Sequence, residues 1–597
     1  MRGDTAALEP MAVLAERLAE GALVQARGNH EQAAAALVAL LRANKVPLLA
    51  LAAALPAPLA TTDAWRQALA LDEECHRQQR QEYLAVRDAW AAAGIPCLAF
   101  KSAGTYPSFP YTSDNLDLLV PADCCALARS ALEEMGYIWL RSIDEPRKFL
   151  FRKFVGGRSV LAVHVHAWVG WDVEFLGQSV WQRCRPAPDD PAVTVPGAED
   201  SVLVNVAHAL YENKRFTLYD LHKISAHWAD PGLDWEYMET LAWRRGWHDG
   251  LLLGLLLCAH AETYLLDRTT APEHLLRRWE RGLERYPWAL AYWQRARRRA
   301  AGDMPYRVSF AVSKLLYYRK VLTDRQLPPS RRLVDLGKVL AWGLKQKSGL
   351  RPQRGLLVSL SGPDGAGKST AAAALASALA TSEVRTRVVW TRCGCSPLYR
   401  RVARLLRSRA AGGDAADGRA GWRPAPGNGL TRALWAWANA IDIYVSLAWR
   451  AWLPRLLGAA VVCDRYAYDA AVELASRLEE RGRLALLAPR LLVALSPRPD
   501  YRFLLDADGR TLRARADEKV PPAVLASQRR MYLVLAAAQG LQVVDTSQPG
   551  TAASDQVTVT VLRGYQDRFR TVLNSLLLSN PRQLNPDDPQ AWTPARR

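Results

Sequence analysis

The chain of 597 residues lacks several features that would assign it to a class of proteins at once. No stretch reaches the roughly 18 uninterrupted apolar residues that span a bilayer, and charges and proline interrupt the long apolar segment at 435–463. The first 20 residues carry charges and no continuous apolar core, so they do not resemble a signal peptide. These absences argue against an integral membrane protein and predict a cytoplasmic one.

Paired cysteines and late histidines are also missing. None of the nine cysteines lies in a Cys-x-x-Cys pair, which argues against a zinc finger and predicts reduced thiols. All ten histidines lie at or before His274, so the C-terminal half would do its chemistry without imidazole. That suits phosphoryl transfer, in which positioning and charge neutralisation dominate.

The residues that are present indicate a folded, basic protein. Half of the chain is hydrophobic and 23% is charged, which excludes wholesale disorder and a coiled-coil rod. The net charge of +19 favours an anionic partner, whether nucleotide phosphates, nucleic acid or an acidic membrane surface.

Apolar runs of strand length alternate with helical patterns in the C-terminal half, which predicts a parallel sheet flanked by helices. The runs are 356–361, 388–391, 459–463, 501–505 and 541–544. Shorter apolar runs at 96–100, 116–120 and 159–169, between helical segments, predict strands of an α+β region before them. We expect five regions: a helical region at 1–95, an α+β domain with a helical extension at 96–300, a basic helical connector at 301–354, an α/β domain at 355–575 and a disordered tail at 576–597.

The strongest motif of the sequence is a phosphate-binding loop. Residues 362–369, Gly-Pro-Asp-Gly-Ala-Gly-Lys-Ser, fit G-x-x-x-x-G-K-[ST] at every fixed position, between an apolar run and an Ala-rich helical pattern. Backbone amides of such a loop surround phosphate oxygens. Lys368 is expected to reach the β- and γ-phosphates of ATP, and Ser369 to ligate Mg²⁺. The expected ATP-binding residues are Gly362, Asp364, Gly365, Ala366, Gly367, Lys368, Ser369 and Thr370.

Two further groups of residues support phosphoryl transfer. Asp464 follows a buried apolar run, where an acidic residue at the sheet edge would hold Mg²⁺ directly or through water. The next residue, Arg465, is expected to bind an acceptor phosphate. Arg513 and Arg515, from a basic cluster that begins at Arg510, are expected to neutralise charge on the transferred group.

These motifs resemble, in order and spacing, the thymidylate kinase family of P-loop nucleotide kinases, over about residues 355–570. The resemblance implies that Asp364 approaches the acceptor sugar, that Arg465 binds its phosphate, and that Asp545 lies near adenine. It is also compatible with an oligomer, because kinases of this family are often dimers, and the sequence leaves the oligomeric state open. Ser361 replaces the Glu that is common ahead of the loop, and residues 391–439 are long and Arg-rich.

The expected function is therefore transfer of the ATP γ-phosphoryl group to a nucleoside monophosphate such as dTMP. One alternative is a kinase for a sugar or a surface-polysaccharide precursor, coupled to nucleotidyl transfer. Another is a non-catalytic ATP-binding switch. The basic run 385–409 has few stacking aromatics, so no specific nucleic-acid binding is expected. Its segment 402–409 would form a basic amphipathic helix suited to peripheral contact with an anionic membrane.

The N-terminal half carries a weaker set of motifs. Residues 100–104, 113–120 and 163–166 resemble the Leu-Lys-Gly, Asp-Ile-Asp-Leu-Leu-Val and Val-Asp-Leu-His motifs of an uncharacterised nucleotidyltransferase family. The likeness spans roughly residues 90–270. It implies a nucleotidyltransferase-like fold in which three carboxylates on neighbouring strands hold two metal ions.

This sequence departs from that pattern at two of the three carboxylates. Asp117 is retained, but Asn115 stands at the first position and His164 at the third. Asp114 lies three residues from Asp117, so in a regular strand it would point to the other face. Lys101 is kept. We therefore expect a degenerate domain, with His164 and His166 either ligating one metal ion or hydrogen-bonded in the core.

Overall fold

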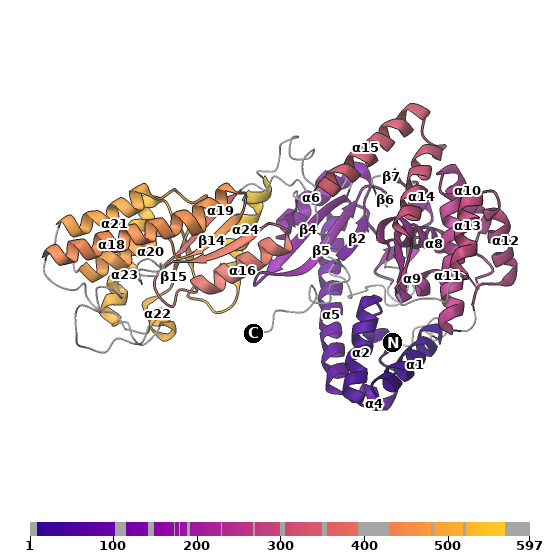
Figure 1. Cartoon of the computed structure of the whole chain (residues 1–597), viewed down its shortest axis with the longest axis horizontal. Helices are drawn as coiled ribbons and strands as arrows, with labels where there is room; N and C mark the ends of the chain where they lie inside the picture. Colours follow the sequence, from indigo (N-terminus) through magenta and orange to yellow (C-terminus); the bar gives the residue numbers. More distant parts are fainter. Residues whose placement is uncertain are drawn as a thin grey trace. The chain divides into compact units, whose positions relative to one another are not determined.

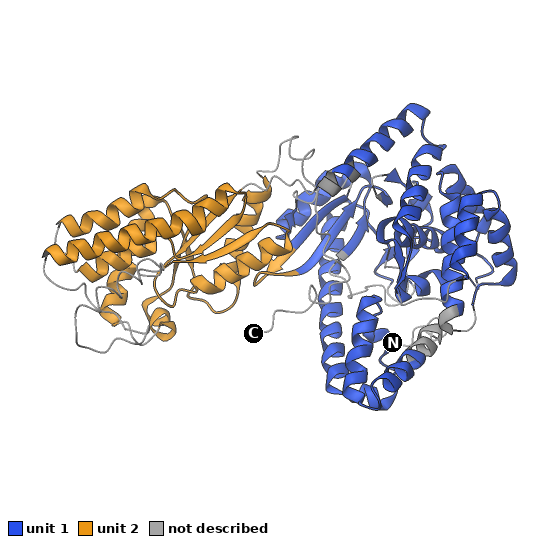
Figure 2. Cartoon of the chain, viewed as in Figure 1, with its two compact units in different colours: residues 1–152, 160–350, 579–597 blue, residues 153–159, 351–578 orange. Residues whose placement is uncertain are grey.

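We describe a computed structural model of the chain, coloured along the sequence in Figure 1. The described residues are 9–101, 115–140, 148–171, 173–177, 179–187, 191–228, 230–266, 269–298, 305–348, 355–391, 429–478, 483–516 and 521–567. Two compact units divide the chain. Unit 1 comprises residues 1–152, 160–350 and 579–597, and unit 2 comprises residues 153–159 and 351–578 (Figure 2).

Unit 1 combines helices with a mixed five-stranded sheet. Its helices are α1 (Glu9–Gln25), α2 (His30–Ala43), α3 (Leu48–Leu51), α4 (Ala57–Ala60), α5 (Asp63–Ala92), η2 (Ala122–Cys124), α6 (Cys125–Glu134), α7 (Ser179–Gln182), α8 (Ala198–Ala207), the π-helix η3 (His208–Asn213), α9 (Leu218–Ser225), α10 (Trp235–Arg244), α11 (His248–Leu266), α12 (Glu273–Leu283), α13 (Pro287–Ala296), α14 (Phe310–Thr323) and α15 (Pro329–Ser348). The sheet has the order β1-β2-β5-β4-β3, formed by β1 (Leu98–Ala99), β2 (Asn115–Leu119), β5 (Arg158–His166), β4 (Lys148–Val155) and β3 (Ile138–Trp139). Three two-stranded ribbons pair β6 (Gly170–Trp171) with β7 (Val173–Glu174), β8 (Arg185–Pro186) with β9 (Thr194–Val195), and β10 (Arg215–Phe216) with β11 (Tyr306–Arg307).

The two faces of the unit 1 sheet differ in chemistry. Leu118 and Val165 pack against Trp90 of α5 and Leu132 of α6, so the face under these helices is apolar. Side chains alternate across a strand, which places Asp117, between Leu116 and Leu118, on the opposite face. The expected connector is part of unit 1, because α14 packs on η3 and β11 pairs with β10.

Unit 2 contains an all-parallel five-stranded sheet covered on both faces by helices. The strand order is β13-β14-β12-β15-β16, from β13 (Thr386–Trp390), β14 (Ala460–Asp464), β12 (Leu356–Ser361), β15 (Tyr501–Asp506) and β16 (Gln542–Asp545). The helices are α16 (Lys368–Thr381), α18 (Gly429–Leu447), η4 (Ala448–Trp452), α19 (Leu453–Leu456), α20 (Ala467–Leu478), α21 (Arg483–Leu495), α22 (Gly509–Arg515), α23 (Pro522–Gln539) and α24 (Ala552–Asp567).

Burial on both faces explains the continuous apolar strands of unit 2. Every residue of β12 and β14 is buried. On one face Val461 and Leu504 pack with residues of α18, α20 and α21, while α16 packs against α24 and the sheet. The predicted fold class is confirmed as mixed α/β, and each of the five apolar runs predicted from the sequence contributes one strand. Among the described helices, none is both long and apolar enough to cross a membrane.

Candidate functional site

The loop between β12 and α16 is built around two glycines with left-handed backbones. Gly365 has φ +87° and Gly367 has φ +80°, conformations that side chains disfavour. A Cβ on Gly365 would also lie 2.9 Å from the Ala516 nitrogen and from the Leu512 carbonyl oxygen, so this position has no room for a side chain. The loop delivers the chain directly into α16, whose N-terminus has no side-chain cap. Its first amides therefore remain available to an anion.

Lys368, the first residue of α16, lies inside this loop. Its ammonium donates to the carbonyl oxygens of Gly362 and Pro363, each at 2.7 Å, and the side chain is 5% exposed. Burial, followed by the positive charge of Arg465, lowers the pKa of Lys368. A phosphate would compensate both effects, because it supplies negative charge and replaces the lost solvation.

Ser369 and Asp464 meet at the carboxyl edge of the sheet. The Ser369 hydroxyl donates to Asp464 Oδ2 at 2.6 Å. The other carboxylate oxygen, Asp464 Oδ1, is buried and has no hydrogen-bond partner among the residues that the structure describes. A buried, unpaired carboxylate oxygen beside a hydroxyl is the oxygen donor set that Mg²⁺ prefers. The residues therefore fit the expected metal ion.

Arg465 and Asp364, the two residues expected at the acceptor, contact each other. The Arg465 guanidinium forms an ion pair with Asp364 Oδ1. The Arg465 backbone has φ +81° and is held by its amide, which donates to Leu360, and by the Thr391 hydroxyl, which donates to its carbonyl oxygen. Burial alone would lower the pKa of Arg465, but the carboxylates of Asp364 and Asp469 together raise it. The guanidinium is thus a permanent cation beside the loop.

Asp469 organises the loop and was missed by the sequence reasoning. Its carboxylate accepts the Ser361 hydroxyl at 2.7 Å, the Gly362 amide at 3.2 Å, the Tyr466 amide at 2.9 Å and the Tyr532 hydroxyl at 3.0 Å. It therefore supplies a carboxylate beside Ser361, the position where the kinase resemblance leads one to expect Glu. Two features of the sequence together could have indicated it: Ser361 stands where Glu is common, and an additional Asp follows five residues after Asp464.

The arginine cluster lies on the short helix α22. Arg510, Arg513 and Arg515 are exposed on α22. Arg515 donates to the Thr546 carbonyl oxygen at 2.8 Å, so its guanidinium is already engaged. The segment 517–520 lies outside the described residues, as does the basic segment 402–409.

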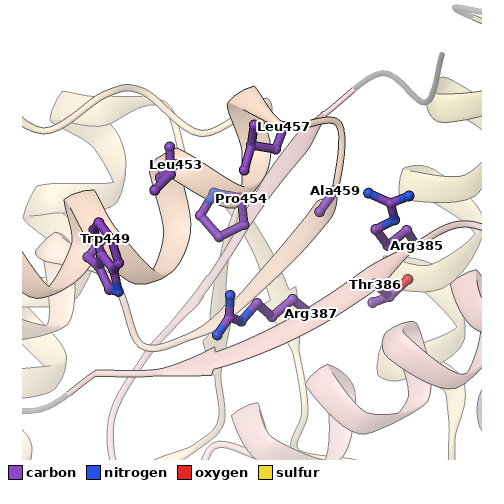
Figure 3. A pocket seen from close by; sticks show the side chains of 8 residues that line it. All are labelled: Arg385, Thr386, Arg387, Trp449, Leu453, Pro454, Leu457 and Ala459. Carbon is purple, nitrogen blue, oxygen red and sulfur yellow. The ribbon is translucent and has the colours of Figure 1, made fainter.

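A cavity of about 360 Å³ lies at the other end of the sheet (Figure 3). Arg385, Thr386 and Arg387, at the beginning of β13, line it together with Trp449, Leu453, Pro454, Leu457 and Ala459. Ligands of open parallel sheets bind at the carboxyl ends of the strands. This cavity is therefore separate from the phosphate loop.

A second polar cluster forms on unit 1, centred on Asp117. Its Oδ1 atom lies 2.9 Å from the Lys101 ammonium, 2.8 Å from His166 Nε2 and 3.3 Å from His164 Nδ1. The parallel register of β2 and β5 pairs Asp117 with His164, and His166 follows two residues later on the same face. Lys101 reaches the cluster from a left-handed backbone, with φ +65°.

Two further residues of this region were predicted for the site, and a third residue that was not predicted joins the cluster. Asn115 begins β2, two residues before Asp117, and Asp114 lies outside the described residues. Glu212 was not predicted; it lies 3.3 Å from the Lys101 ammonium, 3.5 Å from that of Lys148 and 3.2 Å from His208 Nε2. It comes from η3, and no motif spacing connects it to β2.

Burial and neighbouring charges fix the protonation states of the side chains in this cluster. Burial alone would raise the pKa of Asp117, but the Lys101 charge and hydrogen bonds from both histidines lower it well below its usual range. Burial lowers the pKa of His164 and, to about 3, that of His166. The cluster therefore holds an aspartate anion and two neutral imidazoles near neutral pH.

Comparisons with known proteins match different parts of the chain. Residues 29–261 match the family described as "Uncharacterised nucleotidyltransferase". Among solved structures, a crystal structure of thymidylate kinase from Ehrlichia chaffeensis is 16% identical and covers 35% of this chain and 98% of its own, with a TM-score of 0.24. No curated protein matches the chain.

Proposed function

We propose that unit 2 transfers the γ-phosphoryl group of ATP to a nucleoside monophosphate such as dTMP, and that unit 1 is a nucleotidyltransferase-like domain without transferase activity. The observation that carries the first part is the hydrogen bond from Ser369, at the uncapped start of α16, to Asp464, whose other oxygen is buried without a partner among the described residues. The dTMP acceptor rests on the sequence resemblance to thymidylate kinases.

The residues of the loop have distinct roles in this proposal. The amides at the start of α16 bind the phosphate chain, and Lys368 exchanges its two carbonyl contacts for phosphate oxygens. Ser369 and Asp464 hold Mg²⁺, which neutralises charge on the phosphates when it is bound. Asp469 positions the loop through Ser361 and Gly362.

The acceptor side depends on Arg465 and Asp364. A dianionic acceptor phosphate would compete with the Asp364 carboxylate for the Arg465 guanidinium, which releases Asp364 to contact the acceptor. Arg513 is exposed on α22, whose Leu512 carbonyl lies beside Gly365 of the loop, and in this proposal it neutralises charge on the transferred group.

The test is a transfer assay with the full chain, [γ-³²P]ATP, Mg²⁺ and a panel of nucleoside monophosphates and sugar phosphates. We expect labelled dTDP. A labelled non-nucleotide product would show that the protein is a kinase with a different acceptor. Nucleotide binding without turnover would indicate an ATP-binding switch. Transfer that persists in Lys368→Ala would refute the assignment to this loop.

A further inference from the structure

Three side chains of unit 1 present metal-ligand atoms to one point. Ligand atoms of Asp117, His164 and His166 all lie within 4.8 Å of one another. His166 is fully buried, whereas Asp117 and His164 retain side-chain exposures of 14% and 11%. The cluster is therefore largely dry, with two of its members still accessible to an ion.

The fold itself imposes this convergence. β2 and β5 run parallel with Asp117 opposite His164, and alternation along β5 brings His166 to the same face. The opposite face packs under α5 and α6, so the backbone that carries these three residues is rigid. A rigid support holds ligand atoms in place before an ion arrives.

We propose that Asp117, His164 and His166 bind a divalent transition-metal ion. Two imidazole nitrogens and one carboxylate oxygen form a donor set typical of Fe²⁺, Co²⁺, Ni²⁺ or Zn²⁺, whereas Mg²⁺ prefers oxygen ligands alone. The site uses neither the phosphate loop nor Asp464, so it stands independently of the function proposed for unit 2.

Lys101 is the competitor for this ion. Its ammonium lies 2.9 Å from Asp117 Oδ1, which is the oxygen that both histidines also approach. Glu212 offers it a second partner at 3.3 Å, so Lys101 can release Asp117 without losing its ion pair. Metal binding and the Lys101–Asp117 contact therefore oppose each other.

Co²⁺ is a suitable probe because its visible absorption reports nitrogen and oxygen coordination directly. We would titrate the chelator-treated full chain with Co²⁺, in the absence of nucleotide, and then add excess Mg²⁺ or Zn²⁺. We expect one absorbing Co²⁺ per chain that Zn²⁺ displaces and Mg²⁺ does not. A wild-type chain with no absorbing Co²⁺ would overturn the proposal.

Variants separate this site from adventitious binding. His164→Ala should weaken Co²⁺ binding by about 100-fold or more, whereas His274→Ala, which removes an exposed histidine of α12, should leave it unchanged. Lys101→Gln should tighten binding by about tenfold, because it removes the competing ammonium. Equal Co²⁺ affinities in wild type, His164→Ala and Lys101→Gln would overturn the proposal. If one variant proves too unstable to measure, the comparison of the other variant with wild type still tests it.

Discussion

Two buried carboxylates on β-strands, Asp464 in unit 2 and Asp117 in unit 1, differ in what their oxygens meet. Asp464 has one oxygen engaged by Ser369 and another that no described residue hydrogen-bonds. One oxygen of Asp117 is approached by Lys101 and by two imidazoles at once. None of the described cationic side chains forms an ion pair with Asp464, whereas Asp117 already has an ion pair with Lys101.

This difference follows from the residues that surround each carboxylate. In unit 2, the Lys368 ammonium donates to two loop carbonyls, and Asp464 Oδ2 accepts from an uncharged hydroxyl. In unit 1, the strand opposite Asp117 contributes His164 where a nucleotidyltransferase would have a carboxylate. An added cation can therefore reach Asp464 Oδ1 directly, whereas a cation at Asp117 must compete with Lys101.

Removing Lys368 is expected to have the largest effect. Lys368→Ala should lower γ-phosphoryl transfer by about 10³-fold, because the loop loses its only cation inside the ring of amides among the described residues 362–369. The measurement is kcat with the acceptor that the panel identifies. Arg490→Ala, an exposed cation of α21, is the matched control and should retain wild-type rates.

Asp464→Asn is expected to lower transfer by about 10²-fold and to raise the Mg²⁺ concentration needed for half-maximal rate. The cause is loss of the negative charge whose free oxygen would meet the ion. Rates measured across a Mg²⁺ series check this, with Asp442→Asn on α18 as control. An unchanged Mg²⁺ dependence would make Asp464 a structural residue and remove the contrast with Asp117.

Asp469→Asn is expected to destabilise unit 2 by about 2–3 kcal/mol, because two of the four groups that donate to the carboxylate would then face the NH₂ group of the amide. As a positioning residue, Asp469 should affect the KM for ATP more than kcat at temperatures where the variant stays folded. Thermal unfolding and steady-state kinetics measure both. A loss of stability with an unchanged KM would show that Asp469 only supports the fold.

Acid should weaken unit 1 more than unit 2. Burial lowers the pKa of His222 and His227 to about 4 and that of His166 to about 3. The unfolded chain binds protons near pH 6.5 while the folded chain does not, so their stability contribution is complete above pH 6.5 and is lost as the pH falls toward 4. At pH 5, each of these histidines lowers the free energy of unfolding by about 2 kcal/mol relative to its value above pH 6.5.

Three buried carboxyls of unit 1 oppose this trend. Burial raises the pKa of Asp72 to about 6, so the folded state binds its proton first and Asp72 favours folding as the pH falls from 6 toward 4. Burial also raises the pKa of Asp200 and Asp249, but it lowers that of His164 and His208 as well. Five histidines therefore outweigh three carboxyls, and unit 2 has no histidine. Hydrogen-exchange mass spectrometry from pH 7 to pH 5, corrected for intrinsic rates, should show protection lost first in unit 1. Equal losses in both units would contradict the prediction.

The smallest expected signal is nucleotidyl transfer by unit 1. Because Asp117 is the single carboxylate left from the expected three, the chain should incorporate no label from [α-³²P]NTP into itself or a co-substrate. Electrophoresis of the reaction with each of the four nucleotides measures this. Incorporation that disappears in Asp117→Asn would show an active site and reverse the comparison.

The sequence predicted the fold of unit 2 better than that of unit 1. Its strands are buried on both faces and appear as continuous apolar runs, so β12 was predicted with its observed bounds. In unit 1, β4 was missed because polar and apolar residues are interspersed in Lys148–Val155. The two-residue strand β1 was expected to be longer, at 96–100, because a short apolar run does not reveal where pairing ends.

What the sequence determined by itself is local: the glycines and lysine of the phosphate loop are contiguous, and their chemistry depends on backbone conformation over eight residues. Tertiary structure alone decided the contacts across long separations. Asp469 meets Gly362 from 107 residues away, and His166 meets Asp117 from 49. These contacts depend on strand order and register, which arise from packing of the whole unit rather than from any short segment.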